Sequence, residues 1–157
     1  MKKYIILIPI YNDRESLTKL IENINKEVNI VNTEVSVVVI NDASSQQIID
    51  TYNNLENIHS LEIINMKQNR GHTRCIASGL KYIFEKKEFD YVIPMDGDGE
   101  DRPEEIKNFI EISEQSGEKS IVGERIKRSE GLFFQICYKF HKLLTLAFTG
   151  QSIKFGN

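Results

Sequence analysis

The chain has little of what marks several broad classes of protein. Among its 157 residues only Cys75 and Cys137 are cysteines, and they lie far apart without a Cys-x-x-Cys spacing. This usage argues against a disulfide scaffold and against a zinc site, and it favours free, inert thiols in a reducing compartment.

Strong positive charge and long apolar runs are also missing. The formal net charge is −3 and the isoelectric point is about 5.7, so no overall basic footprint is present and we expect no nucleic-acid partner. The N-terminal apolar run Tyr4–Ile10 is too short to span a membrane. It is typical of a first β-strand rather than a signal peptide, and a cytoplasmic location follows as the simplest expectation.

The length and composition fit one ordinary globular domain. The chain is 40% hydrophobic and 27% charged, and no repeat, low-complexity segment or linker divides it. We therefore expect a single domain over residues 1–157. The last residues carry neither a helical pattern nor a charged tail, which predicts that this domain is truncated at its C-terminus.

Short apolar runs alternate with segments of helical periodicity along the chain. The expected strands cover residues 4–8, 35–40, 61–65, 89–95 and 119–123. Five helices are expected: one from Ser16 onward, one over residues 48–55, one over residues 76–84, one that starts at Pro103, and one over Leu132–Phe148. The helix that starts at Pro103 should bury Ile106, Phe109, Ile110 and Ile112. This alternation predicts a doubly wound α/β domain with a mostly parallel sheet flanked by helices.

Four acids follow the fourth expected strand: Asp96, Asp98, Glu100 and Asp101. Ligands of open α/β sheets bind beyond the carboxyl ends of the strands, where these acids would lie. In an extended chain Asp96 and Asp98 would share a face roughly 7 Å apart and repel by about 2–3 kcal/mol. A divalent cation would remove that repulsion, and oxygen ligands without cysteine or histidine favour Mg²⁺ or Mn²⁺ with a phosphorylated ligand.

The acidic segment has two other interpretations, of which one remains open and the other is disfavoured. Asp-Gly pairs form turns, and acids before a helix can cap it, so a purely structural role is a real alternative. A calcium loop of the EF-hand type is disfavoured, because its sixth place holds Asp101 instead of glycine and its twelfth holds Lys107 instead of glutamate.

Further polar residues follow the second and third expected strands. Asp42 could cap a helix or contact a ligand, and the sequence does not decide between them. Gly71 stands where the chain turns into a helix, and Arg70, His72 and Arg74 surround it, which suits either an anion site or solvated surface residues. As a metal ligand His72 lacks a second histidine or cysteine at a suitable spacing.

The segment Leu132–Phe148 has a different texture from the rest of the chain. Its many apolar residues are interrupted by Lys139, His141 and Lys142, so it is a poor membrane span. It fits an interfacial helix, a subunit-contact helix of a homo-oligomer or a helix that covers the sheet.

Five motifs follow one another along the chain: Pro9–Glu15, Asn41–Ser44, Asn69–Gly71, Met95–Glu104 and Gly123–Arg125. In this order they resemble the signature of family 2 glycosyltransferases, most closely the dolichol- or polyprenyl-phosphate sugar synthase branch. The resemblance covers nearly the whole chain. It implies a GT-A fold of Rossmann-like type and a nucleoside-diphosphate-sugar donor linked to UDP or GDP.

The resemblance also implies roles for individual residues. Those expected to bind the nucleotide sugar are Pro9, Tyr11, Asn12, Glu15, Asp42, Asn69, Gly71 and Asp96. The metal, Mg²⁺ or Mn²⁺, would be held by Asp96 and Asp98, with Glu100 where this branch usually has glutamine. Asp98 and Arg125 would be the catalytic residues, the arginine stabilising the departing diphosphate.

The resulting hypothesis is a metal-dependent, inverting glycosyltransferase. Its acceptor would be a polyprenyl phosphate or a cell-surface glycan, reached at the cytoplasmic face of a membrane. The alternative is a catalytically silent module for nucleotide binding or assembly. A nucleotidyltransferase is disfavoured, because the first loop lacks a glycine-rich, basic phosphate cradle.

Overall fold

A computed structural model gives the structure of the chain over residues 1–30, 33–48, 55–117, 119–123 and 132–149. It divides into two compact units, Met1–Ile121 and Val122–Asn157. We describe each unit by itself.

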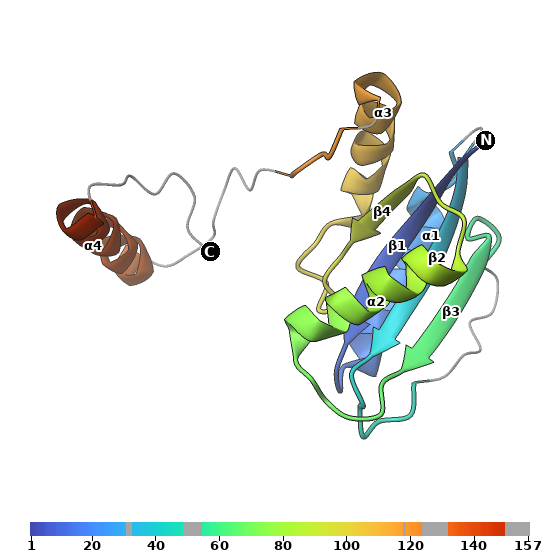
Figure 1. Cartoon of the computed structure of the whole chain (residues 1–157), viewed down its shortest axis with the longest axis horizontal. Coiled ribbons are helices and arrows are strands. Elements are labelled where there is room, and N and C mark those ends of the chain that lie inside the picture. Colours follow the sequence, from blue (N-terminus) through green and yellow to red (C-terminus); the bar gives the residue numbers. More distant parts are fainter. Residues whose placement is uncertain (31–32, 49–54, 118, 124–131, 150–157) are drawn as a thin grey trace. The chain divides into compact units, whose positions relative to one another are not determined.

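The first unit is built on a four-stranded sheet in the order β3-β2-β1-β4 (Figure 1). The strands are β1 (Lys2–Ile10), β2 (Thr33–Asn41), β3 (Ser60–Asn65) and β4 (Tyr91–Pro94). All three neighbouring pairs are parallel, and β1 pairs with β2 along its whole length. The parallel sheet that the alternating pattern predicts is therefore present.

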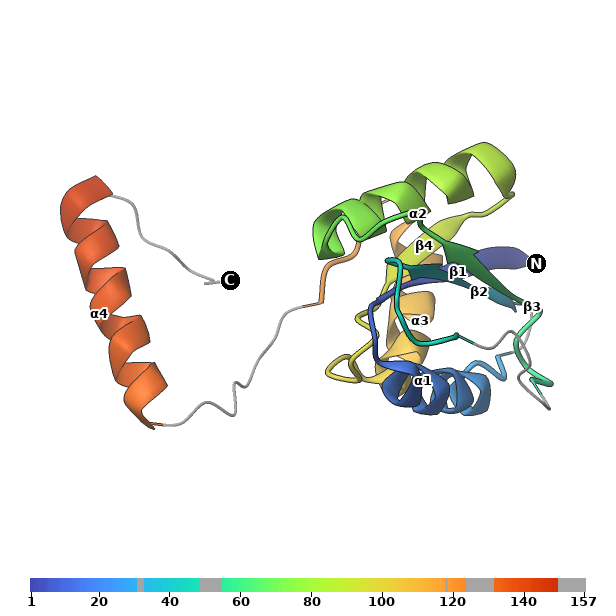
Figure 2. The same ribbon diagram turned by 90° about the horizontal axis from the view of Figure 1, so that it is seen from below.

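Helices cover both faces of this sheet. They are α1 (Arg14–Glu27), α2 (His72–Lys86) and α3 (Ile106–Ser116), the last preceded by the short 3₁₀ turn η1 (Pro103–Glu105). Figure 2 shows α2 on one face and both α1 and α3 on the other. The sheet is thus buried on two sides, as parallel sheets usually are.

The alternation of side chains along the central strand divides the core into two layers. Ile6 and Ile8 of β1 pack with α1 and α3, whereas Ile5 and Leu7 face α2. Because side chains on both faces of β1 are buried in an apolar layer, the strand has the unbroken apolar run seen in the sequence. Tyr4 joins the first layer, where its hydroxyl hydrogen-bonds that of Ser113 at 2.8 Å.

Cys75 belongs to the second layer, at the start of α2. Its thiol is fully buried and donates to the carbonyl oxygen of Ile40 at 3.2 Å. Burial, together with the negative charge of Asp42, raises the pKa of this thiol to about 11. Cys75 and the exposed Cys137 are both free cysteines, which agrees with the expectation from the sequence.

Two expectations about the described residues are wrong. Residues 119–123 form no strand, although the structure describes all five of them. An apolar run becomes a strand only where a sheet edge offers its backbone groups, and the edge strand β4 has just four residues. Ile112 is 46% exposed, because the buried face of α3 repeats at Ile106, Ile110 and Ser113.

The expected helix over residues 48–55 lies mostly at positions 49–54, outside the described residues. The remaining expected strands and helices are present, with ends shifted by a few residues. Of these, β4 shows the largest shortening of a strand, from the expected residues 89–95 to Tyr91–Pro94.

The strand order creates one special place at the carboxyl edge of the sheet. From β1 the chain crosses through α1 to β2 on one side, while β4 lies on the other side of β1. After β3 the chain crosses through α2 to β4, so the strand order reverses between β1 and β4, and such a switch point is where open α/β sheets bind ligands.

The second unit contains α4 (Leu132–Thr149), which matches the helix expected over Leu132–Phe148. Within the described part of this helix several apolar side chains are exposed, among them Phe140, Leu143 and Phe148. None of the described helices is both long enough and apolar enough to cross a membrane.

Gly97, just beyond β4, provides a test of how tightly the loop at the switch point packs on β1. A Cβ at this position would lie 2.6 Å from the carbonyl oxygen of Pro9 and 3.0 Å from Cδ1 of Ile10. We expect Gly97→Ala to lower the free energy of unfolding by about 2–3 kcal/mol in urea titrations, because backbone of β1 must shift.

Gly99→Ala is the matched control for that substitution. Gly99 has a φ of 82°, and a Cβ added to it would meet no atom within 4 Å, so only backbone strain of about 1 kcal/mol should result. Equal losses of stability in the two variants would contradict the close packing of Gly97 on β1.

Candidate active site

The acidic loop, residues 95–102, leaves β4 at the switch point. Its first residue stays paired with the sheet, since the backbone N–H of Met95 donates to the carbonyl oxygen of Leu7 at 3.0 Å. The chain then turns at Gly97 and Asp98, so the condition of an extended chain, under which Asp96 and Asp98 would share a face, is not met. Gly97 packs directly on the backbone of β1, and this close approach bends the chain away.

Two acids of this loop brace its turn. Asp101 Oδ2 accepts the backbone N–H of Asp96 at 2.8 Å, and Asp98 Oδ1 accepts that of Glu100 at 2.9 Å. Asp96 is half-buried, whereas Asp98 and Glu100 are exposed. The turn-forming alternative for the acids therefore describes part of what they do, and Asp98 still faces solvent.

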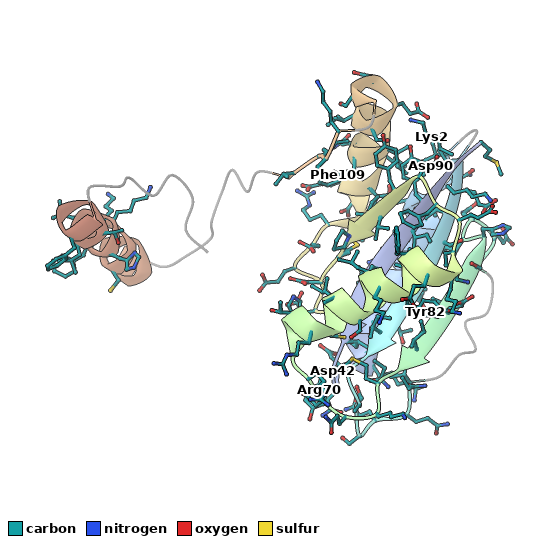
Figure 3. The ribbon with its side chains drawn as sticks, viewed as in Figure 1. Lys2, Asp42, Arg70, Tyr82, Asp90 and Phe109 are labelled. Atoms are coloured by element: carbon teal, nitrogen blue, oxygen red, sulfur yellow. The ribbon has the colours of Figure 1, made fainter. Side chains whose placement is uncertain are left out.

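Asp42, at the end of β2, holds the loop that leads into α2. Only 3% of this residue is exposed, and its two carboxylate oxygens accept the backbone N–H groups of Arg70 and Gly71, each at 2.8 Å. Figure 3 shows Asp42 and Arg70 side by side at the carboxyl edge of the sheet. This is a clamp between two strand ends, and direct contact between Asp42 and a nucleotide stays a prediction.

Asn12 links the loop after β1 to the loop after β2. Its backbone has a φ of 53°, and its N–H donates to Ser44 Oγ at 2.8 Å. Its side-chain oxygen accepts the backbone N–H of Ser45 at 2.8 Å and the hydroxyl of the same residue at 3.0 Å. The next residue, Asp13, caps α1 by accepting the N–H of Ser16.

The other residues expected in the nucleotide site lie at the same edge with different exposures. Pro9 is buried in β1, Tyr11 is 53% exposed, and Glu15 is exposed in the first turn of α1. Asn69 and Gly71 are exposed in the loop before α2. Arg125 lies outside the described residues.

Two residues outside the predicted site also contribute to it. Asn41 is buried, and its side-chain amide donates to Asn65 Oδ1 at 2.7 Å while its oxygen accepts the N–H of Ser44. His72 brings its Nε2 within 3.4 Å of Asp96 Oδ1. Asn41 could have been identified from the sequence, because it is a polar residue at the end of an expected strand. Sequence spacing alone could not place His72 beside Asp96.

The donor set of the acidic loop is compatible with a hard divalent cation. The described residues contain no group of three or more histidine, cysteine, aspartate or glutamate side chains that could hold a metal ion. Mg²⁺, however, is commonly held by one or two carboxylates plus water and substrate phosphates. Asp96 and Asp98 can supply that number.

Curated relatives include undecaprenyl-phosphate 4-deoxy-4-formamido-L-arabinose transferases. The protein of Proteus mirabilis (strain HI4320) is 28% identical over an aligned length of 157 positions, and the alignment covers 98% of this chain and 46% of the relative. That of Photorhabdus laumondii subsp. laumondii is 29% identical, with the same coverage of each chain. The chain thus spans about half the length of the curated relatives it matches.

Solved structures of S. aureus TarS are similar in fold. The structure of TarS residues 1–349 in complex with UDP matches with a TM-score of 0.59 and 24% identity, over 82% of this chain and 39% of that one. A structure of TarS matches with a TM-score of 0.57 and 26% identity, over 73% and 20%. The prediction of a GT-A type α/β fold is confirmed.

A protein-family model also matches the chain. The model described as Glycosyl transferase family 2 covers residues 5–154, nearly the entire sequence and all of the strand-end loops described above. The chain belongs to glycosyltransferase family 2.

Proposed function

We propose that this chain is the donor-binding part of a metal-dependent, inverting glycosyltransferase. The observation that carries the proposal is the acidic loop at the switch point between β1 and β4, in a chain of family 2. The donor would be a UDP- or GDP-linked sugar, and the acceptor a polyprenyl phosphate or a cell-surface glycan.

The names of similar proteins support both substrates. The curated relatives are named undecaprenyl-phosphate 4-deoxy-4-formamido-L-arabinose transferases. The TarS structures include complexes with UDP and with UDP-GlcNAc. We assign the base and ribose to the loops after β1 and β2, with Tyr11 and Glu15 as exposed groups there. Asn69 and Gly71 face the same edge from the loop before α2.

Asp96 and Asp98 are the residues that would hold Mg²⁺ or Mn²⁺, with Glu100 beside them. When bound, the cation offsets the negative charge that develops on the departing nucleoside diphosphate. Asp98 is suited to this contact because its side chain is exposed while Oδ1 is fixed by the N–H of Glu100. The role of Arg125 in stabilising the same charge stays a prediction.

The chemistry of the acceptor decides whether a proton must move. A polyprenyl phosphate presents an oxygen that is already ionised, so attack on the sugar requires no general base. A glycan hydroxyl must lose its proton to a base as it attacks. With a polyprenyl-phosphate acceptor the proposal therefore needs no general base among the described residues, whereas with a glycan acceptor it needs one.

Nucleotide titration tests the donor site. We expect UDP or GDP to bind the purified chain in isothermal titration calorimetry more tightly with Mn²⁺ than without it, because Asp96 and Asp98 would hold a cation that offsets the charge of the diphosphate. Asp98→Ala should remove the Mn²⁺-dependent part of the affinity. Glu111→Ala, which removes an exposed acid on α3, is the control and should leave binding unchanged.

The same preparations distinguish the silent-module alternative. That alternative draws on the braced acidic loop, in which Asp98 and Asp101 already accept backbone N–H groups. A competent donor site should slowly hydrolyse the sugar nucleotide and release nucleoside diphosphate with Mn²⁺ present. Tight nucleotide binding without any such release, in wild type as in Asp98→Ala, would favour the silent module.

The helix α4 supports a location at a membrane surface. At 100° per residue, its exposed residues Phe140, Leu143 and Phe148 fall within one sector of roughly 140°. Lys139 and His141 lie near the two borders of that sector, and the helix sequence contains no acid. Apolar residues flanked by cations are typical of helices that lie in the interface of an anionic bilayer.

Vesicle binding tests this location. The double substitution Lys139→Glu and Lys142→Glu should weaken binding to vesicles of equal parts phosphatidylcholine and phosphatidylglycerol by roughly fivefold, since Lys139 borders the apolar sector and a lysine contributes about 1 kcal/mol near an anionic surface, whereas Lys142 lies on the opposite side of the helix. Lys19→Glu with Lys26→Glu, on α1, is the control with the same change of net charge. Sedimentation that is equal for both double variants would contradict an interfacial α4.

A further inference from the structure

His72 lies in the acidic site although nothing in its sequence spacing places it there. It is the first residue of α2, and its Nε2 lies 3.4 Å from Oδ1 of Asp96, which follows β4. The two side chains are 58% and 48% exposed, so solvent and a ligand can reach both. The contact joins the loop before α2 to the acidic loop across the carboxyl edge of the sheet.

The backbone that carries His72 is held from two directions. Asp42 accepts the N–H groups of the two preceding residues, Arg70 and Gly71, with both oxygens. One turn further on, Cys75 is fully buried, and its thiol donates to the carbonyl oxygen of Ile40 at the end of β2. An exposed imidazole on such an anchored turn has a defined position from which to meet Asp96.

We propose that His72 is a positioning residue for Asp96 in the cation- and donor-binding site. The inference rests on the proposed function, in which Asp96 is a cation ligand. At 3.4 Å the contact is longer than an ordinary N–H···O hydrogen bond, and a closer approach together with a reorientation of the imidazole N–H toward Oδ1 would make it one. The imidazole would then fix the orientation of the Asp96 carboxylate at the place where the cation would be held.

The choice of histidine suits this task chemically. An imidazole N–H can orient a carboxylate as a hydrogen-bond donor, whereas the permanent charge of an arginine would compete with the cation for the same oxygens. Hydrogen-bond partners of metal-binding side chains commonly change metal affinity by about 10- to 100-fold when they are removed. Loss of His72 should therefore weaken cation binding more than it affects folding.

Mn²⁺ binding measured by electron paramagnetic resonance tests the proposal on the full chain, with UDP and separately with GDP present. We expect His72→Ala to weaken Mn²⁺ binding roughly tenfold and His72→Gln to recover most of it, because the glutamine amide offers an N–H donor near the place of Nε2. The thermal midpoints of the three proteins should agree.

His59→Ala is the matched control for the same measurement. His59 is 61% exposed and lies 3.7 Å from a glutamate oxygen of Glu34, but it precedes β3, at the opposite edge of the sheet. This control should bind Mn²⁺ like the wild type. Equal affinity in wild type and His72→Ala would overturn the role of His72 alone, whereas no Mn²⁺ binding by wild type with either nucleotide would overturn the proposed function with it.

Discussion

The buried carboxylate of Asp42 is the contact on which the arrangement of the candidate site depends. It fixes the backbone of Arg70 and Gly71, and with them the first turn of α2, to the end of β2. A buried carboxylate is stable only when its oxygens are satisfied, and here two backbone N–H groups satisfy them. The position of His72, and through it the contact with Asp96, follows from this clamp. The end of β2 and the loop after β3 are thereby joined, and His72 is brought within 3.4 Å of Asp96 beyond β4.

The fold was largely predictable because the spacing of apolar residues along the sequence determines which residues form the core. Continuous apolar runs indicated strands buried on both faces, and helical periods indicated the covering helices. Two predictions failed for physical reasons. Residues 119–123 do not pair with any strand of the described sheet, and Ile112 lies outside the helix face that Ile106 and Ile110 bury. The sequence indicated candidate residues at the strand ends, whose roles stay predictions, but it did not indicate their geometry. Spacing showed that Asp42 and Asp96 follow strands, but the clamp, the turn at Gly97 and the approach of His72 depend on tertiary contacts.

The two units suggest a division of labour within the proposed enzyme. The first presents a rigid sheet edge on which loops from four strands meet, which suits the binding of a charged, polar donor. The second presents α4, whose exposed apolar residues and lysines suit a lipid surface. A lipid-linked phosphate acceptor would connect these two properties, because its head group is polar and its chain remains in the bilayer.

The most direct test of the account is where a cation binds on the chain. Mn²⁺ added with UDP or GDP broadens the NMR signals of nearby amides, so a ¹⁵N-resolved spectrum maps its position without relying on turnover. The account predicts selective broadening at Asp96–Glu100 and at Gly71 and His72, with Lys3, His59 and Asp90 at the opposite edge unaffected. Broadening centred on that opposite edge, or none above the effect of free Mn²⁺, would contradict a donor site at the switch point between β1 and β4.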